Sequence, residues 1–231
     1  MKILIANWKQ NMTLAEVEVW LSDFALLAGS LPAGVEEQLK VILCPSHPFL
    51  PVVAAFAKKY PWLVVGSQDI SQYANGTHTG EVGAFQIADL AKYCVVGHSE
   101  RGESDEVVQL KINETYAAGL IPVVCFVQPE RLNSLKLDGG ETVLLWEDPG
   151  NISHNGVFTP KPSPEIADGA TKIRQDYRIT NPLIYGGSIN RQNARELASI
   201  PQLDGGIVGG ASLDPRHFFE IVQAFAEPAV K

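Results

Sequence analysis

The sequence is poor in cysteine and in positive charge, and it contains no long uninterrupted apolar segment. Among 231 residues there are 3 Cys, and 18 Lys and Arg stand against 26 Asp and Glu, which gives a net charge of −8. Three cysteines exclude a disulfide-rich scaffold, and an acidic chain lacks the basic face that nucleic-acid binders normally present. No apolar run reaches the roughly 18 residues that span a bilayer, so we expect no membrane partner.

The cysteines and the amino-terminal residues indicate a reducing compartment. Cys44, Cys94 and Cys125 each lie in or beside a run rich in Val and Ile, and no CxxC pair is present. This pattern is typical of buried thiols in the cytoplasm. Polar Asn7 interrupts the first apolar run before a signal-peptide core can form, so we expect a cytoplasmic protein.

Short apolar runs alternate with segments of helical period along the whole chain. This alternation is typical of parallel strands that are joined by crossover helices, and several runs are unbroken stretches of Val, Ile and Leu, as expected for strands buried on both faces. The eight expected strands are Ile3–Asn7, Leu39–Cys44, Leu63–Ser67, Tyr93–Val96, Ile121–Cys125, Thr142–Trp146, Leu183–Tyr185 and Gly206–Val208.

Capping signals predict where several helices begin. Thr13 and Glu16 form a capping box, with Leu14, Val17, Leu21 and Phe24 on the buried face and Gly29 at the end. The other expected starts are Ser104 or Asp105, Ser163 before Pro164, and Asp214 before Pro215. Eight strands and about eight helices fit an α/β fold with one closed (β/α)8 barrel over residues 1–231. Alternation alone also fits an open doubly wound sheet.

Polar side chains stand where three of these strands end. Asn7 ends the first strand and Lys9 follows it. Lys9 offers a fixed positive charge to an anionic substrate, although it could equally begin a solvated loop. His98 follows the fourth strand behind a glycine, where its imidazole can reach a substrate oxygen, and Glu100 either supports it or forms a surface ion pair. Glu147 ends the sixth strand and is a candidate general base, although strand-terminal Glu residues commonly face water.

Two glycine-rich segments follow the seventh and eighth strands. They are Tyr185–Ser188 and Gly205–Ser212. Glycine pairs let backbone N–H groups approach an anion closely, and phosphate binding after strands seven and eight recurs in this barrel. Either pair alone is consistent with a tight turn, whereas the two together indicate a phosphate site.

Six segments together resemble the triosephosphate isomerase family, over nearly the whole chain. They are Asn7–Asn11, Gly76–Val82, Gly97–Arg101, Val123–Cys125, Tyr185–Asn190 and Val208–Leu213. The resemblance implies an aldose-ketose isomerase of glycolysis and gluconeogenesis that interconverts dihydroxyacetone phosphate and D-glyceraldehyde 3-phosphate. It implies no metal and no organic cofactor.

The resemblance also implies roles for individual residues. Lys9 would hold the substrate electrostatically, His98 would act as electrophile at the carbonyl, and Glu147 would move the proton between C1 and C2. Glu100 would support this group without touching the substrate. The other residues that it places in the substrate site are Asn7, Ser153, Ser188, Gly209 and Gly210.

The segment from Glu147 to Pro162 is the natural lid, and it departs from the family pattern. Counted from Glu147, Ser153 stands where the family has a phosphate-binding glycine. Its backbone N–H can serve only if the local φ and ψ suit a residue with a Cβ. We therefore expect slower turnover than in a relative with the usual loop.

The resemblance implies self-association as well. Thr77–Val82 resembles the loop that inserts into a neighbouring subunit, so we expect a homodimer. Glu147 follows Cys125 by only 22 positions, a short interval that is closer to the compact archaeal type, which assembles as tetramers. A tetramer is therefore the alternative.

Three functions are open on the sequence alone. The first is an active isomerase, the second is a barrel that acts on another small sugar phosphate, and the third is a weakened phosphate-binding barrel. The presence of Lys9, His98 and Glu147 together favours the first.

Overall fold

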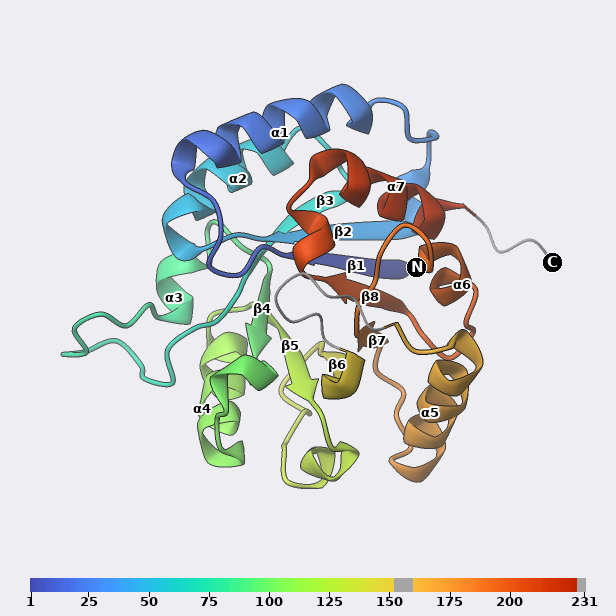
Figure 1. Cartoon of the computed structure of the whole chain (residues 1–231). Coiled ribbons are helices and arrows are strands. Elements are labelled where there is room, and N and C mark those ends of the chain that lie inside the picture. Colours follow the sequence, from blue (N-terminus) through green and yellow to red (C-terminus); the bar gives the residue numbers. More distant parts are fainter. Residues whose placement is uncertain (152–159, 228–231) are drawn as a thin grey trace.

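A computed structural model of the chain describes residues 1–151 and 160–227. Eight parallel strands pair in chain order, and β8 returns to pair with β1, so the sheet closes into a barrel (Figure 1). The strands are β1 (Lys2–Asn7), β2 (Leu39–Cys44), β3 (Leu63–Ser67), β4 (Tyr93–Val96), β5 (Ile121–Phe126), β6 (Val143–Glu147), β7 (Leu183–Gly186) and β8 (Gly205–Val208).

The closed barrel confirms the expected fold class, and the open sheet is excluded by the pairing of β1 with β8. Strand boundaries agree with the expectation to within one residue at each end. Some strands are longer than expected because backbone pairing continues past the apolar run, as at Lys2, which pairs with Leu39, and at Gly205, which pairs with Ile3. β6 instead begins one residue later than expected, at Val143.

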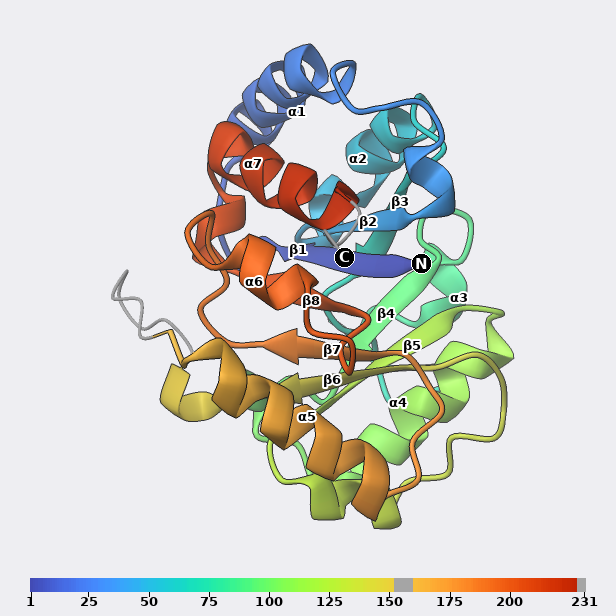
Figure 2. The same cartoon turned by 90° about the vertical axis from the view of Figure 1, so that its right-hand side faces the viewer.

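Helices surround the barrel, and Figure 2 shows α5, α6 and α7 along one side of it. The α-helices are α1 (Leu14–Ala28), α2 (Leu50–Ala57), α3 (Ala84–Ile87), α4 (Asp105–Ala117), α5 (Ser163–Asp176), α6 (Ala194–Ala198) and α7 (Pro215–Ala226). The 3-10 helices are η1 (Val35–Glu37), η2 (His47–Phe49), η3 (Ser99–Arg101), η4 (Pro129–Asn133), η5 (Pro149–Asn151) and η6 (Gly210–Ser212). In residues 1–151 and 160–227, none of the helices is long and apolar enough to cross a bilayer.

The expectation of about eight helices is wrong at one crossover. Between β5 and β6 the described chain forms only η4, so seven α-helices surround the eight strands in the two described ranges. Pro129 begins η4, and Gly139 and Gly140 precede β6, so the stretch between them is shorter than an average α-helix. A side chain at Gly139 would also meet the ring of Tyr116 at 2.5 Å.

Three of the four expected caps are confirmed. The side chains of Thr13, Ser104 and Asp214 each accept a hydrogen bond from a backbone N–H in the first turn of α1, α4 and α7. Ser163 is instead the first residue of α5, and its hydroxyl donates to Glu196 at 2.7 Å. The prediction that Leu14 is buried is also wrong, since it is 50% exposed in the first turn of α1.

The core has two layers that follow from the alternation of side chains along each strand. One layer lies inside the barrel, and the other fills the space between the strands and the helices. On β1, Ile3 and Ile5 point inward while Leu4 and Ala6 point outward. The next inward position is Asn7, so the alternation itself brings a polar side chain to the end of the barrel at the carboxyl ends of the strands.

Gly205 lies where the barrel closes. Its φ is +155°, and a Cβ built on it would lie 1.7 Å from the carbonyl oxygen of Ile3 on the neighbouring strand. Only glycine can occupy this position without a shift of β1 or β8, because a Cβ would overlap backbone atoms rather than a movable side chain.

Candidate active site

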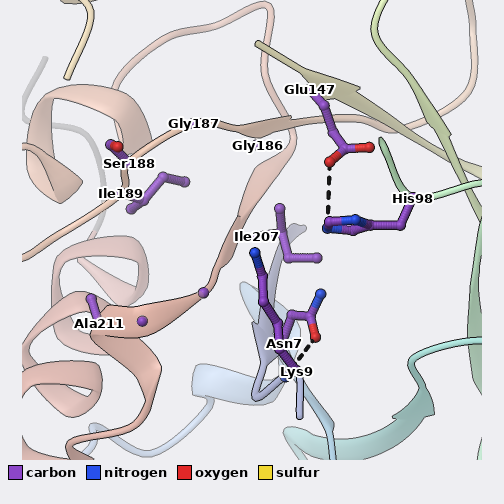
Figure 3. A pocket seen from close by; sticks show the side chains of 12 residues that line it. Asn7, Lys9, His98, Glu147, Gly186, Gly187, Ser188, Ile189, Ile207 and Ala211 are labelled. Carbon is purple, nitrogen blue, oxygen red and sulfur yellow. Dashed lines mark hydrogen bonds and ion pairs between the residues drawn. The ribbon is translucent and has the colours of Figure 1, made fainter. Parts of the chain in front are cut away.

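A cavity of about 470 Å³, counted with its opening to solvent, lies at the carboxyl ends of the strands (Figure 3). It is lined by Asn7, Lys9, His98, Glu147, Gly186, Gly187, Ser188, Ile189, Ile207, Gly209, Gly210 and Ala211. Seven of the predicted site residues therefore meet around one cavity, and Glu100 lies beside it. Ser153 lies outside the described residues.

Glu147 reaches the cavity because it occupies the last inward position of β6, after Val143 and Leu145. It is 2% exposed. Ser99 holds its carboxylate: the backbone N–H donates to Oε2 at 2.9 Å, and the hydroxyl donates to Oε1 at 2.8 Å. A buried carboxylate fixed at the mouth of the barrel can serve as a base for a substrate that enters the cavity. The sequence reasoning assigned no role to Ser99.

His98 points into the cavity because of the glycine before it. Alternation along β4, in which Tyr93 and Val95 point inward, would turn residue 98 outward, but Gly97 has a φ of +74° and changes the direction of the chain. Its Nε2 then lies 3.4 Å from Oε1 of Glu147 (Figure 3). The Nδ1 atom accepts the backbone N–H of Glu100 at 3.2 Å, so the neutral ring carries its proton on Nε2 and presents a donor to the cavity.

Lys9 lies beyond the first strand, because β1 ends at Asn7, as expected. The Lys9 backbone has a φ of +50°, in the left-handed region, which costs a residue other than glycine about 1–3 kcal/mol. Its N–H donates to Oδ1 of Asn7 at 3.0 Å. The side chain extends into the cavity past Gly209 (Figure 3). Its ammonium pairs with Glu100, which lies beside the cavity.

The opposite side of the cavity is built from the segments after β7 and β8. Ser188 has a φ of +40°, and its hydroxyl donates to the carbonyl of Asn151. A Cβ at Gly187 would lie 2.4 Å from the hydroxyl of Tyr185, and Gly209 precedes the first turn of η6. At these glycines no side chain covers the backbone that faces the cavity, so an anion can approach the backbone closely.

An ion-pair network fixes the segment that carries His98. Arg101 in η3 contacts Asp69 at 3.0 Å and Glu103 at 2.6 Å. The ammonium of Lys111, which is 3% exposed, bonds the same two carboxylates at 2.6 and 2.7 Å. The segment from His98 to Arg101 is thereby tied to β3 and α4, and its position does not depend on the loop alone.

The chemistry available in this cavity is acid–base chemistry next to a positive charge. Burial raises the pKa of the thiols of Cys44, Cys94 and Cys125, so none of them supplies a thiolate. The part of the chain that the structure describes holds no group of three or more His, Cys, Asp or Glu side chains that could bind a metal ion. One carboxylate, one imidazole N–H donor and one ammonium remain.

Comparisons with known proteins point to one family. The family model described as Triosephosphate isomerase matches residues 2–137 and 158–225. The protein named Triosephosphate isomerase from Polynucleobacter asymbioticus is 31% identical over 252 residues, which cover 96% of this chain and 98% of the relative. The protein of the same name from Synechococcus sp. strain JA-3-3Ab is 35% identical over 240 residues, which cover 95% and 94%.

A crystal structure of triosephosphate isomerase from Bartonella henselae has the same fold, with a TM-score of 0.76 and 23% identity over 98% of this chain and 99% of that chain. The two ranges matched by the family model omit residues 138–157, so the place of Glu147 in the site depends on the geometry above. The match covers most of the chain on both sides of that gap, and the two relatives match nearly from end to end. The chain belongs to the triosephosphate isomerase family.

Proposed function

We propose that this protein is a triosephosphate isomerase that interconverts dihydroxyacetone phosphate and D-glyceraldehyde 3-phosphate without a cofactor. One observation carries the assignment: Lys9, His98 and Glu147, from three different strand ends, line a single cavity beside the backbone of Gly209 and Gly210. A three-carbon phosphate is the class of substrate that such a cavity fits, with its carbonyl at His98 and its phosphate at the glycines.

The reaction begins when Glu147 takes a proton from the carbon next to the carbonyl. The electrons of that C–H bond form a C=C bond, and the carbonyl π electrons move to oxygen and give an enediolate. His98 donates its Nε2–H to the oxygen on which charge develops, and the ammonium of Lys9 stabilises the same negative charge. Glu147 then returns its proton to the former carbonyl carbon. Meanwhile the hydroxyl proton moves by way of Nε2 of His98 to the charged oxygen, so the other oxygen becomes the new carbonyl. Each oxygen of Glu147 accepts one hydrogen bond from Ser99 in this structure and keeps a second lone pair that can take up the proton.

A phosphate subsite on the opposite side completes the proposal. Ser188, Gly209 and Gly210 line that side, and Asn7 holds the backbone of Lys9. A negatively charged phosphate there is favoured by the positive charge of Lys9 and by the exposed backbone of the glycines. Ser153 is proposed as a further contact on sequence grounds alone.

A coupled assay with D-glyceraldehyde 3-phosphate as substrate tests the function. We expect formation of dihydroxyacetone phosphate, followed as oxidation of NADH by an added glycerol-3-phosphate dehydrogenase. Turnover of a different small sugar phosphate only would favour the second function that the sequence left open. Phosphate binding without turnover of any of them would favour the third.

The protein is also proposed to associate with itself, as a homodimer or, alternatively, a tetramer. The loop between β3 and α3 projects from the barrel in Figure 1, and residues 73–81 are exposed. Tyr73 and His78 stack within it at 4.1 Å between ring centroids. A cavity beside the active site, lined in part by Ser46, His47 and Gln68, offers a place for the loop of a second copy.

Light scattering at micromolar concentration checks this association. We expect a mass of at least twice 25.1 kDa. We expect deletion of residues 75–79 to lower this mass toward that of the monomer, because it removes the exposed tip of the loop that is proposed to reach the second copy. A monomeric mass for the unaltered protein would contradict the proposal. The buried free thiols support a cytoplasmic location.

A further inference from the structure

The carbonyl of Lys9 is held by two side chains that do not line the substrate cavity. Its oxygen accepts two hydrogen bonds, from the hydroxyl of Ser46 at 3.0 Å and from Nε2 of Gln68 at 2.9 Å. The N–H of Lys9 donates to Oδ1 of Asn7 at 3.0 Å. Both lone pairs of the carbonyl and the single amide hydrogen are therefore used.

The two donors come from the strands that follow β1 in the barrel. Ser46 lies two residues beyond the end of β2, and Gln68 directly follows β3. Gln68 also donates to the carbonyl of Cys44, the last residue of β2, at 2.9 Å. The Lys9 peptide is thus fastened to β2 and β3, while Asn7 ties it to its own strand.

These hydrogen bonds matter because the Lys9 backbone has a positive φ, which a lysine does not keep without contacts that hold it. At a φ of +50° the Cβ lies close to the following carbonyl, and a lysine released from its contacts returns to negative φ. That change redirects the Cα–Cβ bond and moves the ammonium away from the cavity. A strained residue persists only where its surroundings hold it.

We propose that Ser46 and Gln68 are positioning residues for the ammonium of Lys9, which they aim into the substrate cavity by holding the Lys9 carbonyl. The inference rests on the proposed function, because it assumes that Lys9 binds the anionic substrate. Neither residue lines the substrate cavity. Both line the adjoining cavity together with Lys9 and His98, and the proposal assigns their effect on catalysis to Lys9.

A double-mutant cycle with Lys9 tests this dependence. Ser46→Ala, Gln68→Ala and the two together are compared in the native background and in a Lys9→Ala background, by kcat/KM for D-glyceraldehyde 3-phosphate and by the Kd of inorganic phosphate. In the native background we expect the pair of substitutions to lower kcat/KM about 10- to 100-fold and to weaken phosphate binding. In the Lys9→Ala background we expect less than about twofold further change, because their target is already gone.

Two matched variants separate positioning from loss of structure. Ser46→Thr keeps the hydroxyl and is expected to keep kcat/KM. Ser30→Ala removes a similar hydroxyl-to-carbonyl bond, to Leu27 at 2.8 Å, from the exposed end of α1, and is expected to have no effect. If Gln68→Ala does not fold, Gln68→Glu removes the donor at nearly constant size, and the same cycle is run with it.

Equal losses in both backgrounds would overturn the proposal, since Ser46 and Gln68 would then act independently of Lys9. Unchanged kcat/KM in the native background would overturn it as well. If the native protein shows no isomerase activity, the proposed function fails, and the cycle is then read from phosphate Kd alone. In that case a loss of phosphate affinity that vanishes with Lys9→Ala supports the positioning role, and any other pattern overturns it.

Discussion

Replacing Glu147 by glutamine is expected to lower kcat by about 10²- to 10⁴-fold while the protein stays folded. A general base contributes a factor of this size, and an amide cannot take up the proton. The amide oxygen can still accept one bond from Ser99, whose N–H and hydroxyl hold the carboxylate in the native protein. Steady-state kinetics with D-glyceraldehyde 3-phosphate, together with thermal unfolding, measures the two effects separately.

Glu18→Gln is the matched control, because Glu18 is exposed on α1, away from the cavity. We expect native kinetics from it. Turnover by Glu147→Gln that equals the native value would remove Glu147 from the mechanism. A variant that loses phosphate affinity together with kcat would show that the substitution disturbed the site as a whole, and the assignment of the base would then need another residue at the same strand end.

Gly205→Ala is expected to have the largest effect on stability. The added Cβ would lie 1.7 Å from the carbonyl oxygen, 2.6 Å from the carbonyl carbon and 2.9 Å from the nitrogen of Ile3. These are backbone atoms of the strand that closes the barrel, so no rotamer change relieves the overlap. We expect the free energy of unfolding to fall by more than about 4 kcal/mol, a loss reserved for severe core defects, or the variant to yield no soluble protein. Denaturant unfolding at fixed protein concentration measures it.

Gly29→Ala is the matched control for this loss. Gly29 has a φ of −69°, and a Cβ there would meet nothing within 4 Å. The substitution is expected to leave the free energy of unfolding unchanged or to raise it by up to about 1 kcal/mol, because alanine restricts the unfolded chain. A Gly205→Ala protein as stable as Gly29→Ala would mean that β1 and β8 can separate locally without loss of the closed barrel.

The eight strands could be predicted from the sequence because burial on both faces produces short apolar runs, whereas the closure of the sheet into a barrel is shown by the pairing of β1 with β8. Strands such as Leu39–Cys44 and Tyr93–Val96 are short apolar runs, and both were predicted with the boundaries that the structure has. The outer layer was less predictable. A crossover needs only to return the chain to the other end of the barrel, and the segment between β5 and β6 does so with η4 in place of an α-helix.

Some residues of the candidate site could be predicted from the sequence, and others were missed. Lys9, His98 and Glu147 are charged or titratable side chains at strand ends, and this position draws attention to them in the sequence. Ser46, Gln68 and Ser99 also follow strand ends directly or within three residues. Their partners, however, are a backbone carbonyl or a carboxylate on a different strand, and such pairings exist only once the barrel has closed.

The short crossover between β5 and β6 is a site where a peptide can be inserted into the barrel. Residues 138–140 are exposed and precede the amino end of β6, at the opposite end of the strands from the cavity. Doubling the length of a flexible loop costs only about 0.6 kcal/mol of closure entropy. A peptide grafted there would extend the flank of the molecule without reaching the chemistry, which makes this stretch the natural attachment point for an added tag or binding epitope.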